Sequence, residues 1–288
     1  MTNWSVTEIA GFAESALLYE VALTPKPGLV DRSNNGAHQD MNFFTFMDSI
    51  VALAPFFQQY LQAGLTHRGS LPALFEELRI LGVPAEKAML KATAGVNTHK
   101  GANFSLAVLL GATGFYLQED TLPFTAEDTG AVLKIASQMT AELVEKDFAN
   151  LLNKKQLTYG EKLYLEQGLT GIRGEAAAGY PVLTQLMLPY LRVLNQESAD
   201  LEENLLRCLI LLMSEVEDGN LLHRGGFEAW QQVKTESKKI HQAQLTKEQL
   251  LDELAAYDQI LIKRHLSPGG AADLLALGIY FAKLEGLF

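Results

Sequence analysis

The stretch at residues 24–40 joins two segments of helical spacing and carries an unusual density of side chains that could do chemistry. A connector between helices usually needs only a few residues. Binding and catalytic residues concentrate on loops that a rigid scaffold holds in place. We therefore expect this loop to form part of a binding or catalytic site. Its candidate residues are Lys26, Asp31, Arg32, Asn34, Asn35, His38 and Asp40.

Two further carboxylates fall on segments that are otherwise apolar. Glu20 lies on the same helical stripe as Leu17, where a carboxylate is costly unless it is paired or bound to metal. Fraying of the helix end, which would return Glu20 to water, is the alternative. Asp48 lies in a segment that is apolar on most sides, so we expect it to be partly buried. Asp40, eight residues earlier, is expected to cap that helix, and the two could line one wall of a pocket.

Three other breaks between helical segments combine glycine with cations, amides or carboxylates. Ordinary helix ends explain any one of them, because glycine terminates helices and basic residues favour the C-terminal turn. Their repetition in an acidic chain favours an anionic ligand instead, since glycine lets the backbone approach phosphate. Carboxylates at a helix end near 215–218 oppose the helix dipole and need Arg224 or a metal as compensation. The candidates in these breaks are Asn97, His99, Lys100, Arg173, Glu175, Glu215, Asp218 and Arg224.

Helical spacing dominates the rest of the chain and predicts the scaffold for these breaks. No segment shows the period-two alternation of a strand. We therefore predict an all-α fold, a single globular multi-helix bundle of about ten or more helices, in one catalytic domain over residues 1–288. Capping boxes are expected at Ser5–Glu8, Thr125–Asp128 and Thr246–Gln249. After the first helix, the predicted helices span roughly 43–63, 71–81, 84–94, 102–118, 126–150, 175–195, 200–217, 227–241, 247–264 and 269–285.

The bulk composition excludes several classes of protein. The net charge of −11 argues against an open nucleic-acid surface, which needs clustered Lys and Arg. The single cysteine, Cys208, rules out an internal disulfide and suits a reducing cytoplasm. No signal peptide and no apolar run long enough to span a membrane is visible in the sequence. We therefore expect a cytoplasmic protein that binds neither nucleic acid nor membrane.

Several of these segments together resemble the triphosphoribosyl-dephospho-coenzyme A synthase family. The resemblance runs from about residue 14 to the C-terminus. The motifs that carry it are Glu20-Val-x-Leu-Thr-Pro-Lys-Pro-Gly-Leu-Val-Asp31, Asn34-Asn-Gly-Ala-His38-x-Asp-Met, Asn97-Thr-His-Lys-Gly101, Gly171-Ile-Arg-Gly-Glu175-Ala and Ser267-Pro-Gly-Gly-Ala-Ala-Asp273-Leu-Leu.

The resemblance implies a reaction and its substrates. ATP would donate its 5-triphosphoribosyl group to the 2′-hydroxyl of 3′-dephospho-coenzyme A, and adenine would leave. The product would be the precursor of the prosthetic group of citrate lyase or malonate decarboxylase. A downstream holo-acyl-carrier-protein transferase would be a separate protein. The sequence does not fix the oligomeric state, and a homodimer is one alternative.

This chemistry suggests roles for the candidate residues, although the division among them stays open. Breaking the glycosidic bond develops positive charge on the ribose, which nearby carboxylates would stabilise, and proton transfers need an acid and a base. Acid–base or other catalytic roles are assigned to Asp31, His38, Asp40 and His99. Substrate binding is assigned to Lys26, Arg32, Asn34, Asn35, Asn97, Lys100, Arg173 and Arg224. Binding of Mg²⁺ is assigned to Glu20, Asp48, Glu175, Glu215 and Asp218.

Two alternatives remain open from the residues alone. An all-helical, Mg²⁺-dependent nucleotide or ADP-ribose hydrolase would use the same charged loops with water as the nucleophile. A non-catalytic nucleotide-binding helical protein would explain the helices without the chemistry. If these loops form one binding or catalytic site, the loops at 24–40, 95–103, 168–175 and 215–226 should face one cavity.

Overall fold

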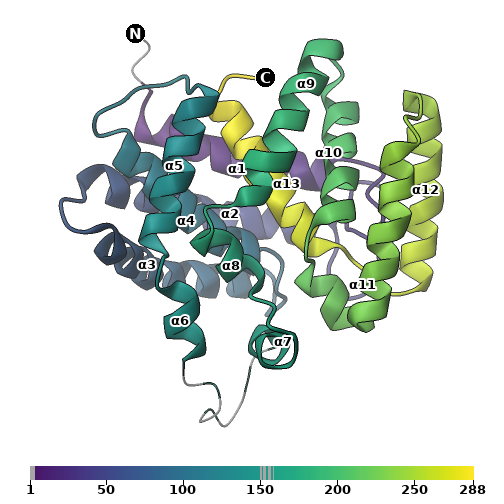
Figure 1. The fold of residues 1–288 in the computed structure, drawn as a ribbon, viewed down its shortest axis with the longest axis horizontal. Coiled ribbons are helices and arrows are strands. Elements are labelled where there is room, and N and C mark those ends of the chain that lie inside the picture. The colour runs from purple at the N-terminus through teal and green to yellow at the C-terminus, as the bar shows by residue number, and fades with distance from the viewer. Residues whose placement is uncertain (1–3, 150, 152–153, 155–156, 158) are drawn as a thin grey trace.

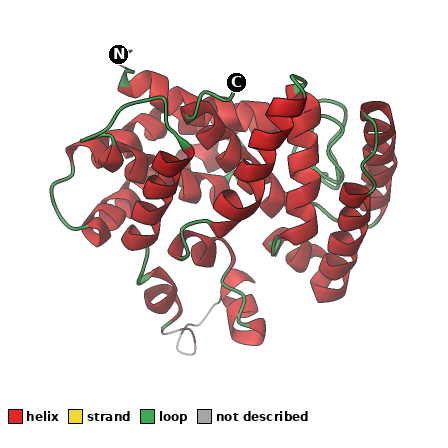
Figure 2. Cartoon of the chain, turned by 45° about the horizontal axis from the view of Figure 1, so that its top comes forward, coloured by secondary structure: helices red, strands yellow, loops and turns green. Residues whose placement is uncertain are grey.

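The described part of the chain is helical, in agreement with the predicted fold class. A computed structural model describes residues 4–149, 151, 154, 157 and 159–288. Within these residues every regular element is a helix and none is a strand (Figure 2). The helices are α1 (Val6–Ala22), α2 (Phe43–Thr66), α3 (Leu71–Ala92), α4 (Lys100–Tyr116), α5 (Ala126–Met139), α6 (Leu143–Phe148), α7 (Tyr159–Gln167), α8 (Gly171–Ala177), the π-helix η2 (Leu183–Met187), α9 (Leu188–Glu197), α10 (Leu201–Glu215), α11 (Gly219–Gln242), α12 (Lys247–Lys263) and α13 (Gly269–Leu284).

Two apolar helices, α4 and α13, lie at the centre, and α13 crosses the middle of the molecule in Figure 1. Both are rich in alanine, leucine and glycine, and most of their side chains are buried against α1, α2 and α10. Helix α2 approaches α4 closely because Gly64 of α2 and Gly114 of α4 lie between them. A Cβ added at either glycine would clash with the backbone of the other helix, and one added at Gly111 would clash with Leu78 of α3. Burial on all sides fixes these two helices as the scaffold on which the other helices pack.

The three predicted capping boxes are present, at Ser5, Thr125 and Thr246. The cap of α2 is different from the prediction. Asn42, and not Asp40, accepts the hydrogen bond from the Thr45 backbone N–H. Asp40 therefore lies outside the helix and stays available to the loop.

Two predicted divisions of this part of the chain into helices are wrong. The segments 71–81 and 84–94 form one helix, α3, which continues through Pro84. Proline removes the hydrogen bond to the carbonyl of Ile80, and Ile80 is 73% exposed, so water can solvate that carbonyl. The segment predicted at 126–150 breaks at Thr140, whose hydroxyl bonds to the Ala136 carbonyl. Residue 150, its predicted end, lies outside the described residues.

The region 151–195 also departs from the sequence pattern. Helix α7 was not predicted, and the segment expected at 175–195 is divided among α8, η2 and α9. Helices α6 and α7 project from one side of the molecule, whereas α11 and α12 form a hairpin at another (Figure 1). Among the helices described, none is both long and apolar enough to cross a membrane.

Candidate functional site

A cavity of about 830 Å³ is lined by residues from all four predicted loops and from the start of α13. The prediction that these loops face one cavity is therefore confirmed. The cavity brings together Glu20, Lys26, His38, Asp40, Asn97, His99, Lys100, Arg173, Glu175 and Arg224. The roles of these residues stay predictions.

The N-terminal ends of three long helices open onto this cavity. The lining includes the first residues of α4 (Lys100 and Gly101), of α11 (Gly219 and Asn220) and of α13 (Gly269). A helix N-terminus carries partial positive charge and unpaired backbone N–H groups. Their convergence gives this acidic protein a local field that favours an anionic ligand.

Three buried side chains, Glu20, Lys26 and His99, and the half-buried Asp273 form what we call the buried cluster. Glu20 is 4% exposed, Lys26 is 1% exposed, and their side chains form an ion pair. Burial raises the pKa of Glu20, while the ammonium of Lys26 opposes that rise. Glu20 is therefore buried and paired, and the alternative of a frayed helix end is wrong.

Asp273 was quoted in a sequence motif but was not selected as a site residue. It lines the cavity and, within the described residues, makes no hydrogen bond or ion pair. Burial raises its pKa well above the usual range, and the charges of Glu20 and Asp218 raise it further. A Cβ added at Gly101 would clash with the Asp273 carboxylate, so Gly101 makes room for that group. This is a different use of Gly101 from the phosphate contact that the sequence suggested.

His38 and Arg224 join the loop at 24–40 to the other side of the cavity. Arg224 donates to His38 Nδ1 at 3.0 Å and to the Ala37 carbonyl at 3.1 Å. His38 Nε2 lies 2.9 Å from the Ser267 hydroxyl. Burial and the Arg224 charge lower the pKa of His38, against the opposite effect of Asp40. A neutral His38 with both ring nitrogens engaged holds the loop and Arg224 in place.

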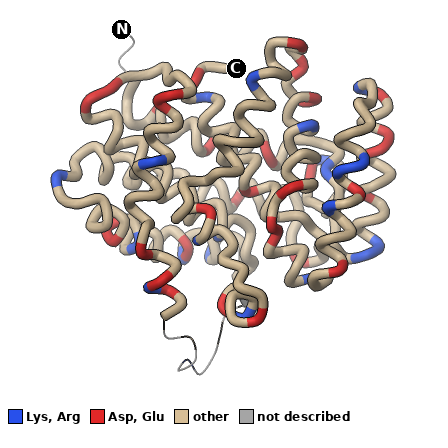
Figure 3. The backbone as a smooth tube through the Cα atoms, viewed as in Figure 1, with Lys and Arg blue, Asp and Glu red and all other residues tan. Residues whose placement is uncertain are grey.

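Two cations of the cavity, Lys100 and Arg173, already have carboxylate partners. Lys100 pairs with Glu86 at 2.7 Å, and Arg173 pairs with Asp147 at 2.8 Å. Figure 3 shows Lys and Arg interspersed with Asp and Glu over the helices. A phosphate would therefore compete with these carboxylates for Lys100 and Arg173. Such half-exposed pairs are weak, so exchange of partners costs little.

Two carboxyl groups, Glu175 and Glu217, line the cavity beside α8. One oxygen of Glu175 is buried without a hydrogen-bond partner. Burial raises the pKa of Glu175, and the charge of Glu217 raises it further. The Gly171 N–H donates to Glu217 at 3.3 Å. Glu217 also has a raised pKa through burial and was not selected from the sequence.

Asp31 and Asn34 do not line the cavity but organise the loop at 24–40. The Asp31 carboxylate accepts hydrogen bonds from the Thr24 hydroxyl and from three backbone N–H groups of its own loop, including that of Lys26 at 3.0 Å. Asn34 donates to Asp258 at 2.9 Å, which ties the loop to α12. Asn35 also lies outside the lining. These residues shape the backbone from which Lys26 and His38 reach the site.

Arg32, Asp48, Glu215 and Asp218 also lie outside the lining. The expectation that Asp48 is partly buried is wrong, since it is exposed on α2. Arg32 pairs with Glu202 in solvent. The Glu215 carboxylate pairs with the Lys238 ammonium at 3.3 Å and not with Arg224.

Asp218 caps the start of α11 and links it to α13. Its carboxylate accepts the backbone N–H groups of Asn220, Leu221 and Ala271. Burial raises the pKa of Asp218 to about 6 in spite of these bonds. The five carboxylates predicted as metal ligands do not converge, and within the described residues no group of three or more His, Cys, Asp or Glu side chains is placed to hold a metal.

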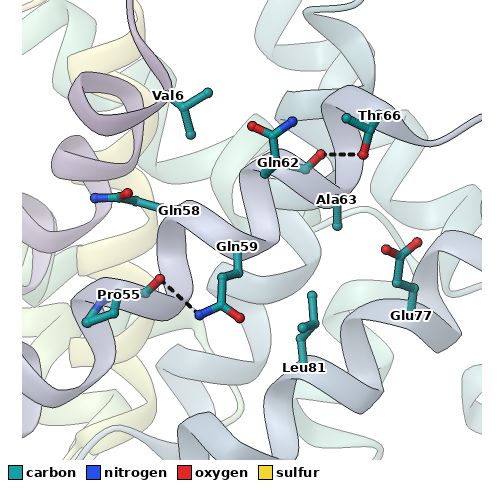
Figure 4. A pocket seen from close by; sticks show the side chains of 9 residues that line it. All are labelled: Val6, Pro55, Gln58, Gln59, Gln62, Ala63, Thr66, Glu77 and Leu81. Atoms are coloured by element: carbon teal, nitrogen blue, oxygen red, sulfur yellow. Dashed lines mark hydrogen bonds between the residues drawn. The ribbon is translucent and has the colours of Figure 1, made fainter.

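A second pocket, of about 590 Å³, lies between α2 and α3 (Figure 4). Its polar lining consists mainly of glutamines, and Gln59 donates to the Pro55 carbonyl of its own helix. It includes one carboxylate, Glu77, and no Lys, Arg or His, and none of the predicted site residues. The larger cavity is therefore the candidate active site.

Known proteins with similar sequences point to the same chemistry. The profile of the family described as CitG: ATP:dephospho-CoA triphosphoribosyl transferase matches residues 6–288. A relative from Streptococcus equi subsp. zooepidemicus is 53% identical over 292 residues, and one from Streptococcus pyogenes serotype M1 is 51% identical over 294. The match covers 99% of both chains in the first case and 100% of both in the second. Each carries the name "Probable 2-(5''-triphosphoribosyl)-3'-dephosphocoenzyme-A synthase".

A solved structure shares the fold at low sequence identity. It carries the name "putative triphosphoribosyl-dephospho-coA synthase from Archaeoglobus fulgidus" and superposes with a TM-score of 0.50 at 21% identity. The superposition covers 84% of this chain and 100% of the other. The sequence match over nearly the whole chain shows that this protein belongs to the ATP:dephospho-CoA triphosphoribosyl transferase family.

Proposed function

We propose that the cavity transfers the 5-triphosphoribosyl group of ATP to the 2′-hydroxyl of 3′-dephospho-CoA, with release of adenine. The family supplies the substrates and the group that is transferred. The observation that carries the assignment to this cavity is that it holds groups of both signs. Glu20 and Asp273 supply carboxylates, whereas three helix N-termini and the cations Lys100, Arg173 and Arg224 supply positive charge.

The buried carboxylates suit the reacting sugar. As the bond from C1′ to adenine breaks, positive charge develops on the ribose. Glu20 and Asp273 would stabilise that charge from a site sheltered from water, where electrostatic interactions are strong. Lys26 would keep Glu20 ionised and oriented through their ion pair. Asp40, an exposed carboxylate of the lining, is our candidate base for the incoming hydroxyl.

The positive part of the cavity suits the triphosphate, which is transferred without being cleaved. Lys100, Arg173 and Arg224 would exchange their present partners for phosphate oxygens. The helix N-termini would add backbone N–H donors. Asn97, which accepts the Lys100 backbone N–H at 3.2 Å, would fix the start of α4 beside the triphosphate.

Magnesium fits this arrangement as a companion of the triphosphate. Mg²⁺ prefers oxygen ligands and is usually held by one or two carboxylates together with substrate phosphates. Glu175 supplies such a carboxylate, because one of its buried oxygens has no partner and it lies two residues from Arg173. When bound, the ion would neutralise part of the triphosphate charge. A separate downstream transferase, a homodimer and a cytoplasmic location stay predictions.

The test is a reaction of the purified protein with ATP, Mg²⁺ and dephospho-CoA, followed by mass spectrometry and quantification of adenine. We expect adenine and a product that contains both the triphosphoribosyl group and dephospho-CoA in equal amounts. Adenine release with free ribose triphosphate in the absence of dephospho-CoA would favour the hydrolase instead. Tight binding of ATP without turnover would favour a non-catalytic protein.

A further inference from the structure

We infer that His99 is a fixed, neutral hydrogen-bond donor to the adenine of ATP, and that Ser49 and Thr98 set its tautomer. The inference rests on the proposed function, since adenine is a ligand only if ATP is the substrate. It gives His99 a different role from the proton transfer that the sequence suggested.

The hydrogen bonds around Ser49 place the proton of His99. Thr98 Oγ1 donates to Ser49 Oγ at 2.7 Å, and Ser49 Oγ lies 2.7 Å from His99 Nδ1. Ser49 is fully buried and has one hydroxyl hydrogen, which can pair only by going to Nδ1. The histidine proton then resides on Nε2. The opposite tautomer would leave the Ser49 hydrogen unpaired, at a cost of about 1–3 kcal/mol for a buried polar group.

The Nε2 atom is left without a partner, in a side chain that lines the cavity. His99 is 3% exposed, and its Nε2 is buried and makes no hydrogen bond among the described residues. Burial and the nearby Lys26 charge lower the pKa of His99 to about 3. The titratable groups nearest to it are Lys26, its partner Glu20 and Asp273 of the same cluster, and Lys100, the next residue in the chain. The ring is therefore neutral at physiological pH, and Nε2–H is a donor that awaits a ligand.

The surroundings of His99 suit an aromatic base better than a phosphate. The Phe46 ring meets the His99 ring edge-on, with centroids 4.9 Å apart. Leu29 and Met41 add apolar surface to the same cavity. Of the exposed cations, Lys100 follows His99 directly in the chain, but its ammonium pairs with Glu86. A neutral donor among apolar side chains matches the ring nitrogens N3 and N7 of adenine, which are acceptors in a flat apolar ring.

Such a donor would assist the chemical step. When the bond between C1′ and N9 breaks, its electron pair goes to adenine and spreads over N3 and N7. A hydrogen bond to either nitrogen therefore strengthens in the transition state. The new bond forms between C1′ and the 2′-oxygen of dephospho-CoA. The hydroxyl proton, taken by the base, balances the proton that the released adenine acquires at N9.

The test compares ATP with 3-deaza-ATP and 7-deaza-ATP, each of which lacks one acceptor, in the native protein and in His99→Ala. We expect one analogue to lower kcat/KM of the native protein by roughly 10- to 100-fold. In His99→Ala, kcat/KM for ATP itself should be low. The same analogue should then react with His99→Ala about as fast as ATP does. Equal losses in both proteins, or no loss in the native protein with either analogue, would overturn the inference. Failure of the native protein to convert ATP would instead overturn the proposed function, and this inference with it.

A spectroscopic measurement tests the tautomer in the native protein without any variant. ¹⁵N NMR of the histidine side chains should show His99 as neutral, with the proton on Nε2, between about pH 5 and pH 8. A protonated ring at pH 6, or the Nδ1–H tautomer, would contradict the inference. Ser49→Ala should lower kcat and weaken the discrimination against the deaza analogue, whereas Ser49→Thr, which keeps the hydroxyl, should restore both.

Discussion

The buried cluster and the exposed cations line the same cavity but differ in how folding has prepared them. Glu20, Lys26 and His99 are buried and Asp273 is half-buried, and their charges and protons depend on one another. Lys100 and Arg173 remain in contact with solvent and already have surface partners. The electrostatic interactions of a buried charge are strong because little water or salt lies near it. Those of an exposed charge are weakened by water and salt. The buried cluster should therefore control the chemical step, and the exposed cations should control affinity.

The largest effect is expected when the buried ion pair is broken. Lys26→Met leaves the Glu20 carboxylate buried without its partner, and we expect a loss of about 3–5 kcal/mol in the free energy of unfolding. Urea denaturation of the purified variant measures this loss. The double variant Lys26→Met/Glu20→Gln removes both charges and should recover most of the stability. If the double variant were no more stable than Lys26→Met, the unpaired Glu20 carboxylate would not be the cause of the lost stability.

Asp273 should matter more for activity than for stability. Asp273→Asn keeps the shape but cannot ionise when positive charge develops on the ribose, and we expect kcat to fall roughly 10²- to 10³-fold, as when one electrostatic contact to a transition state is lost. Because burial disfavours the charged form of Asp273, the variant should be at least as stable as the native protein. Adenine release and urea denaturation provide the two measurements. Asp252→Asn, the same change on the exposed side of α12, is the control, and an equal loss of activity there would refute the assignment.

His99 links the buried cluster to the pH dependence of stability. Its pKa is about 3 in the folded protein against 6.5 for the free side chain, so below pH 6.5 the unfolded chain binds a proton that the folded protein does not. The stabilisation is therefore present above pH 6.5 and is lost as the pH falls. Between pH 7 and pH 5 the native protein should lose about 2 kcal/mol more than His99→Gln. Urea denaturation at pH 7 and at pH 5 measures the free energy of unfolding of both proteins. If the native protein and His99→Gln lost the same amount between these pH values, His99 would not be buried in its neutral form.

Sequence reasoning found Glu20 but missed Asp273, although the same argument applies to both. Each is a carboxylate within an apolar helical stripe, and Asp273 is surrounded by Ala271, Ala272 and Leu274. Asp48 was misjudged because its helix carries apolar residues on more than one side. Phe44 and Val51 of α2 are exposed, so composition alone did not show which side faces the core.

Carboxylates that hold loops were the hardest to separate from carboxylates that bind ligands. Asp31 and Asp218 lie in the polar, glycine-containing segments where a site was expected, but their oxygens accept backbone N–H groups. Residue types in sequence do not show which of these partners a carboxylate will take. The helices were easier to predict, because capping boxes act over four residues. The convergence of the starts of α4, α11 and α13 depends on packing between distant segments.

The exposed cations should show a smaller and salt-dependent effect. Lys100→Gln should raise KM for ATP by roughly threefold to tenfold with little change in kcat, because one screened contact to the triphosphate is lost. The effect should shrink at high salt. Lys91→Gln on α3, an exposed lysine outside the cavity lining, is the matched control. A fall in kcat with unchanged KM would move Lys100 from affinity to the chemical step.

The smallest effect is expected at Asp48, where sequence and structure disagree. Asp48 lies next to Ser49, which contacts His99, but its own side chain points into solvent, away from the cavity lining. Asp48→Asn should therefore change kcat/KM by less than about twofold, as is usual for surface substitutions. Ser49→Ala, one residue away, should lower kcat through His99. Equal losses at the two positions would mean that the start of α2 acts as a whole, and would remove the distinction between buried and exposed side chains at this end of the cavity.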